Sequence, residues 1–256
     1  MNGWFAQLDR ILRGEETAPE RLTSGQMETP LAGLLVAMLM LAIVSGATLG
    51  AFGVIRGAEQ GALQVFASAI KFPLLFVLTL VVTLPSLYVF NALIGSSLNW
   101  MSVLRLAVAS AAVMLAVSAS FAPIVVFFAV SSSSYPFMKL LVVVFSGISG
   151  ALGLAFLLRT LQRLVFPERV APVRTSEIAE ADEPAAPIES IPGADDVRAV
   201  RVFRVWVAVF GLVGAQMAWV LRPFIGSPAL PFAWFRPRES NFFVDVLRSI
   251  TELLGG

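Results

Sequence analysis

The side chains that most often do chemistry in proteins are nearly absent from the apolar part of this chain. Its 256 residues include no His and no Cys, and five long apolar stretches contain no Asp or Glu. Proton relays, metal centres and thiol redox reactions inside a membrane depend on those groups. The sequence therefore predicts no catalytic residue, no metal site and no cofactor, and we expect a protein that is not an enzyme.

Four polar residues in or beside the apolar stretches are candidates for a functional role: Lys71, Asn91, Gln216 and Arg222. An ammonium group there is costly unless it reaches water or meets a polar partner. Lys71 comes about one turn inside its stretch, which favours contact with water. Asn91 follows Pro85, and its amide can bond the carbonyl that the proline frees or bridge to another helix. Gln216 lies deeper, whereas the guanidinium of Arg222 suits a lipid phosphate, a carbonyl-rich turn or an anchor at the headgroups.

Composition places the chain in the membrane class. It is 57% hydrophobic and 14% charged, against roughly 45–50% and about 25% in soluble domains. A net charge of +1 gives no reason to expect binding to nucleic acid. We therefore expect a polytopic membrane protein.

Five stretches are long enough to cross the membrane as helices, since a span needs about 20 apolar residues. They cover residues 30–55, 69–95, 103–131, 136–163 and 200–225. Pro73 and Pro85 in the second stretch and Pro123 in the third predict kinks. The predicted fold is an all-α polytopic transmembrane helix bundle with about five spans.

Both ends of the chain have the pattern of amphipathic helices that lie at the membrane surface. Ser240 is a plausible N-cap for the C-terminal helix. Aromatic side chains are expected at the interface with the headgroups. These aromatics are Trp4, Trp219, Trp234, Phe242 and Phe243.

The region between the fourth and fifth stretches, residues 164–199, is rich in Pro and acidic residues. Such a composition buries too little apolar surface to fold, so we predict a disordered cytoplasmic loop. A simple tether is the favoured interpretation, and docking of a protein partner on the acidic run is the alternative. The predicted organisation has five parts: a cytoplasmic amphipathic segment (1–29), a four-span bundle (30–163), this loop (164–199), a fifth span (200–225) and an extracytoplasmic aromatic loop with a helix (226–256).

Basic residues predict the orientation, because Arg and Lys near span ends are retained on the cytoplasmic side. Eleven of the eighteen basic residues lie on the side of the N-terminus and of the 164–199 loop. The sequence therefore predicts a cytoplasmic N-terminus and an extracytoplasmic C-terminus.

Small residues recur at about one-turn spacing in three of the stretches, which lets helices approach closely. They are Gly46, Gly50 and Gly53, then Ser146, Gly150 and Gly153, and finally Gly211 and Ala215. Packing within one chain is the favoured interpretation, and contact between chains is the alternative.

Two blocks of sequence resemble a known group of proteins. Residues 71–75 (K-F-P-L-L) and 216–224 (Q-M-A-W-V-L-R-P-F) resemble blocks of an uncharacterised bacterial multi-pass family that is similar to Yip1-type five-span membrane proteins. The Asp-Leu-Tyr-Gly-Pro motif of eukaryotic Yip1 proteins is missing. The resemblance thus implies five spans in a bacterial cytoplasmic (inner) membrane, and it says little about activity.

Two functions remain open at this point. The favoured one is a non-enzymatic scaffold, anchor or assembly subunit, whose partners are membrane lipids and either other proteins or further copies of the chain. The alternative is a small channel or transporter with a pathway lined by polar residues of spans two, three and five.

Overall fold

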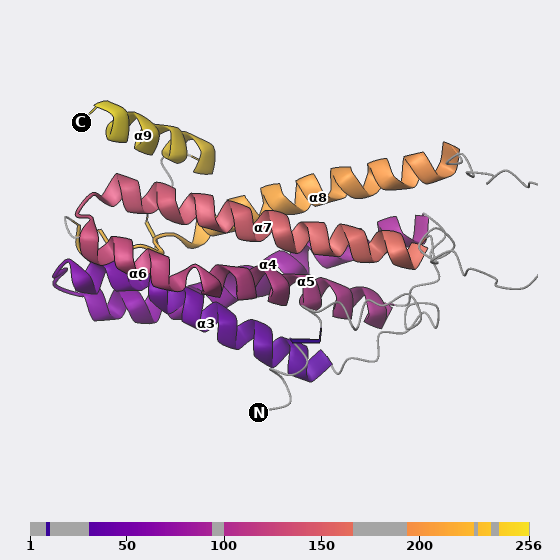
Figure 1. Ribbon diagram of the computed structural model, residues 1–256, viewed down its shortest axis with the longest axis horizontal. Coiled ribbons are helices and arrows are strands. Elements are labelled where there is room, and N and C mark those ends of the chain that lie inside the picture. Colours follow the sequence, from indigo (N-terminus) through magenta and orange to yellow (C-terminus); the bar gives the residue numbers. More distant parts are fainter. Residues whose placement is uncertain are drawn as a thin grey trace, which may run out of the picture.

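The structure is a computed structural model, and it describes residues 9–10, 31–93, 100–165, 194–227, 230–236 and 241–255. Within these ranges the regular elements are helices, without strands (Figure 1). The helices are α3 (Leu31–Ile55), α4 (Gly61–Leu93), α5 (Trp100–Ser120), α6 (Ala122–Ser131), α7 (Tyr135–Val165), α8 (Ala194–Leu221) and α9 (Phe242–Gly255).

Four helical stretches are long and apolar enough to cross a membrane, and α8 contains a shorter apolar stretch, Val207–Leu221. The four are Leu31–Ile55, Gly61–Val89, Trp100–Ser131 and Tyr135–Thr160. The prediction of an all-α bundle with several apolar helices is therefore confirmed.

Some boundaries differ from the predicted ones. A turn at residues 56–60, with Gly57 at a φ of 71°, leads directly into α4, which begins at Gly61 instead of residue 69. The polar residues Gln64 and Ser68 had interrupted the apolar run there. Likewise α8 begins at Ala194, six residues before the predicted span.

The third span is divided into α5 and α6 at Phe121. Pro123 lies in the first turn of α6 and has no N–H to continue the hydrogen bonds of α5. The break is confined to Phe121, which keeps helical backbone angles (φ −81°, ψ −10°), in line with the predicted kink. In α4, by contrast, the helix continues through both Pro73 and Pro85.

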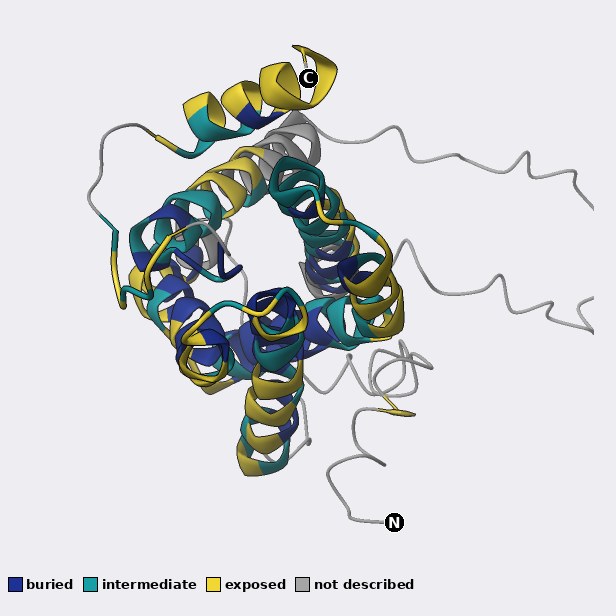
Figure 2. Cartoon of the chain, turned by 90° about the vertical axis from the view of Figure 1, so that its left-hand side faces the viewer, coloured by how far each residue is buried: buried dark blue, intermediate teal, exposed yellow. Residues whose placement is uncertain are grey.

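Five long helices form a ring in the order α3, α4, α8, α7 and α5, and each packs on the next (Figure 2). The contact of α3 with α4 is the most extensive, and that of α7 with α8 is the least. The core between α3, α4 and α5 includes Leu34, Met38, Leu106 and Leu115, all fully buried.

Glycines on α3 allow its close packing on α4. A Cβ atom added to Gly46 would lie 2.4 Å from the carbonyl oxygen of Ser68, and one added to Gly50 would lie 2.6 Å from the Cα of Val65. These small residues therefore act within the chain. Gly147 of α7 differs, because no atom lies within 4 Å of an added Cβ.

Helix α9 crosses the outer side of α7, at the end of the bundle where α3 turns into α4 (Figures 1 and 2). Its cap is Asn241 and not Ser240, because the Val244 N–H donates to Asn241 Oδ1 at 3.0 Å. An ion pair of 3.0 Å between Lys139 of α7 and Asp245 holds it there, while Phe243 and Leu247 are exposed. The predicted amphipathic C-terminal helix is confirmed. The N-terminal one and most of the 164–199 loop lie outside the described residues.

The α3–α4 contact predicts opposite effects for two Gly→Ala substitutions. Gly46→Ala should lower the free energy of unfolding by about 1–3 kcal/mol, because the new methyl group overlaps the α4 backbone. Gly147→Ala, in open space, should raise it by about 0.5–1 kcal/mol through a better helix propensity. Equilibrium unfolding in mixed detergent micelles measures both, and equal effects would contradict the packing described.

Candidate functional site

The chain does not continue as a helix after α8 but folds back into the bundle. Pro223 cannot extend the helix and disfavours helical geometry at Arg222, so α8 ends at Leu221. We call residues 222–227 the inserted segment. Its residues Pro223, Ile225, Gly226 and Ser227 are buried.

Gly226 is the point of closest approach between the inserted segment and the helices. A Cβ atom there would lie 3.3 Å from the Cα of Gly53 on α3 and 2.9 Å from the Cγ of Gln64 on α4. A larger residue would displace the segment or its neighbours. The backbone therefore lies directly against two spanning helices.

Three side chains of α4 bind carbonyl groups of the chain beyond α8, and we call Gln64, Ser68 and Lys71 the α4 clamp. Their spacing of four and three residues places them on one face of the helix. All three are buried, with at most 4% of each exposed. Non-helical backbone within a membrane bundle needs such partners, since no water is available to it.

The clamp donates hydrogen bonds to three backbone carbonyl oxygens, two adjacent in sequence and one ten residues further on. Gln64 Nε2 donates to the carbonyl oxygens of Pro223 and Phe224, at 3.0 and 3.2 Å. Ser68 Oγ donates to the Phe224 oxygen at 2.6 Å. Lys71 Nζ donates to the Pro223 oxygen at 3.5 Å and also to the Trp234 oxygen.

The position of Lys71 corrects the sequence-based expectation. Because α4 begins at Gly61, Lys71 is ten residues into the helix, about 15 Å from its start at 1.5 Å per residue. Its side chain is 1% exposed and does not reach water. The ammonium lies over the rings of Trp234 and Phe235, 5.7 and 5.0 Å from their centroids. Carbonyl oxygens and ring faces thus surround the charge.

Arg222 and Trp219 form a stacked pair at the end of α8. The guanidinium carbon lies 3.6 Å from the centroid of the Trp219 ring. Trp219 is 6% exposed, so it packs inside the chain and does not take the interfacial position expected from the sequence. Trp234 and Phe243 expose about half of their side chains, 45% and 50%, and Phe242 packs edge-on against Phe243.

The remaining predicted site residues do not join the clamp. Gln216 is partly buried on α8, and no hydrogen bond connects it to Gln64, Ser68 or Lys71. Asn91 lies in α4 by its backbone, and its side chain is outside the described residues, as is Trp4. The sequence analysis did not identify Gln64 and Ser68. Their spacing of four and three residues up to Lys71 places all three on one helix face.

Several other hydroxyl groups in the spans bond to their own helices. Thr79 and Thr83 donate to the carbonyl oxygens of Leu75 and Thr79, both at 2.7 Å. Ser110 donates to the Ala107 oxygen at 2.9 Å. These hydroxyls contribute no free polar surface to a pathway between the helices.

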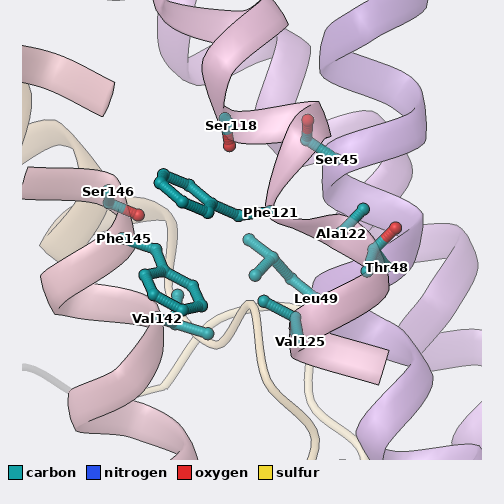
Figure 3. Close-up of a pocket in the computed structure, with 10 residues that line it drawn as sticks. All are labelled: Ser45, Thr48, Leu49, Ser118, Phe121, Ala122, Val125, Val142, Phe145 and Ser146. Atoms are coloured by element: carbon teal, nitrogen blue, oxygen red, sulfur yellow. The ribbon is translucent and has the colours of Figure 1, made fainter. Parts of the chain in front are cut away.

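A small cavity lies beside the break between α5 and α6 (Figure 3). Its volume of about 20 Å³ is enough for one water molecule. The rings of Phe121 and Phe145 stack beside it, 4.4 Å apart. The part of the chain that the structure describes contains no group of three His, Cys, Asp or Glu residues that could hold a metal ion.

The regular elements of the described residues are all helices. The length and composition of the apolar ones are compatible with an integral, multi-pass membrane protein. Comparison with protein-family models, curated proteins and solved structures finds no match. The resemblance to Yip1-type proteins therefore stays a prediction, and function has to be argued from the geometry.

The substitution Lys71→Met tests whether the α4 clamp holds the inserted segment in place. A cysteine introduced at Ser227, which is 8% exposed, serves as the reporter in a chain without other cysteines. Loss of the ammonium leaves the Trp234 carbonyl without its donor, at a cost of about 1–3 kcal/mol, while Gln64 still donates to the Pro223 oxygen. We expect Lys71→Met to speed labelling of the reporter by a maleimide roughly tenfold.

Thr79→Val is the matched control, because Thr79 bonds only within α4. It should leave the labelling rate unchanged. Equal protection of the reporter in Lys71→Met and in the parent would show that Lys71 does not hold the segment.

Proposed function

We propose that the chain is a non-enzymatic integral membrane protein that acts as a scaffold, anchor or assembly subunit. The observation that carries this proposal is the use of the buried polar groups: the α4 clamp is occupied by the chain's own carbonyls. A site for a substrate needs polar groups that remain available to it.

The same contacts weigh against a pathway for ions or solutes. A channel or transporter would use polar residues of the second, third and fifth spans as its lining. Lys71 is bound to the inserted segment and to the Trp234 carbonyl, and Thr79, Thr83 and Ser110 are bound to their own helices. The cavity at Phe121 is far below the roughly 300–1,000 Å³ of ligand pockets.

The outer surface supports a role in contacts with lipids and proteins. Exposed apolar side chains cover the outside of the ring, among them Phe66, Val81 and Phe127. We propose membrane lipids and other proteins, or a second copy of the chain, as the partners, and no nucleic acid.

The proposed setting is a bacterial cytoplasmic membrane, in line with the Yip1-like resemblance. We place the N-terminus in the cytoplasm and α9 outside, since most basic residues lie on the side of the N-terminus and of the α7–α8 connection. The α3–α4 turn lies at the same end of the bundle as α9 (Figure 1).

Labelling of single cysteine substitutions distinguishes a scaffold from a protein with a pore. We expect a membrane-impermeant maleimide, added outside intact cells, to label Glu59→Cys in the α3–α4 turn. Thr79→Cys, Thr83→Cys and Gln216→Cys should remain unlabelled, because these positions meet only protein or lipid. Labelling of the last three would support a water-filled pathway, and labelling of Glu59→Cys only after the cells are opened would reverse the orientation.

A scaffold also requires a partner that remains bound. Extraction in a mild detergent, followed by size measurement and mass spectrometry, should recover the chain in a complex of fixed stoichiometry. A monomer without bound protein under every such condition would contradict the assembly role.

A further inference from the structure

We propose that the cavity at the break between α5 and α6 binds one ordered water molecule, which bridges the hydroxyl groups of Ser45 on α3 and Ser118 on α5. This inference goes beyond the scaffold role and does not depend on it. It rests on a buried hydroxyl that has no partner among the described residues, on a cavity of matching size and on the backbone of the break.

Ser45 differs from the buried hydroxyl groups that bond to their own helices. Its side chain is 3% exposed, and its Oγ atom has no hydrogen-bond partner within the described part of the chain. Thr48, one turn later on α3, donates to the Val44 oxygen at 2.8 Å. Buried polar side chains in proteins are bonded either to the protein or to ordered water. Ser45 therefore needs a polar partner that the described chain does not supply.

The cavity beside Ser45 has the size and the lining that a water molecule requires. Its volume of about 20 Å³ exceeds the roughly 10–15 Å³ that one water needs. Hydroxyl groups from three helices line it: Ser45 and Thr48 of α3, Ser118 of α5 and Ser146 of α7 (Figure 3). A buried water typically forms about three hydrogen bonds, and this lining offers enough donors and acceptors for them.

The backbone of the break adds acceptors on the α5 side of the cavity. The Phe121 N–H is shared by the carbonyl oxygens of Val117 and Ser118, at 3.3 and 3.2 Å, at or beyond the long end of the usual range. Pro123 has no N–H to donate to the carbonyl of Ala119, four residues earlier. The end of α5 therefore keeps acceptor capacity that a water molecule can use.

The lining favours water over a metal ion or an apolar molecule. None of the described residues that line the cavity carries a carboxylate, so a metal ion would have no counter-charge in the interior of the bundle. An apolar molecule would leave Ser45 without a partner. A water molecule satisfies Ser45 and also joins α3 to α5, two helices that already pack on each other. The bridge thus fixes the break in place against α3.

Structure determination of the full chain in lipid nanodiscs, at a resolution that shows water molecules, tests the site without any substitution. We expect one peak in the cavity, about 2.5–3.0 Å from both Ser45 Oγ and Ser118 Oγ, the range of O–H···O hydrogen bonds. A cavity without a peak would overturn the proposal. A peak surrounded by five or more oxygen atoms at shorter distances would identify a metal ion and would equally overturn it.

A double-mutant cycle tests whether the water links the two hydroxyl groups. Either substitution removes the bridge, so Ser45→Ala, Ser118→Ala and the double variant should lower the midpoint of thermal unfolding by a similar amount, about 2–4 °C. Additive effects of the two substitutions would show that no bridge connects them.

Ser110→Ala is the matched control, since Ser110 lies eight residues before Ser118 on α5 and donates to the Ala107 oxygen of its own helix. Its effect should add to that of Ser45→Ala, because the two sites share no partner. If Ser45→Ala or Ser118→Ala does not fold, the structure of the parent protein decides alone.

Discussion

Backbone carbonyl groups outside a helix need hydrogen-bond donors when they lie inside a membrane bundle, and the rest of this structure depends on how that need is met. Once α8 ends at Leu221, the following carbonyls have no partners within a helix. Burying an amide without a partner costs roughly 2–7 kcal/mol. The α4 clamp removes this cost for Pro223, Phe224 and Trp234.

The clamp also determines how the ring of helices closes. Helix α8 packs on α4 more extensively than on α7, and the inserted segment extends this contact to Gly53 of α3. Lys71 thereby joins the second span to the chain beyond the fifth. An ammonium used in this way stabilises an architecture, and this is the physical basis for proposing a scaffold over a transporter.

The helices and most of their bounds follow from the sequence, because long apolar runs and the absence of charge determine them locally. The contacts that polar side chains make in the folded bundle do not follow from the sequence. Gln64 and Ser68 are unremarkable until the inserted segment lies against them, and their polarity led to a start of the second span that was eight residues too late. The depth of Lys71 depends in the same way on partners 152 and 163 positions away and on a turn that hydropathy does not reveal.

The most direct measurement is disulfide formation between α4 and the inserted segment. An ideal Cβ on Gly226 lies 3.5 Å from the Cβ of Gln64, at the short end of the range of about 3.5–4.5 Å found in disulfides. In native membranes under mild oxidation, Gln64→Cys with Gly226→Cys should cross-link rapidly, whereas Leu63→Cys with Gly226→Cys, on the exposed side of α4, should not. A folded protein that cross-links neither pair, or both equally, would contradict the account.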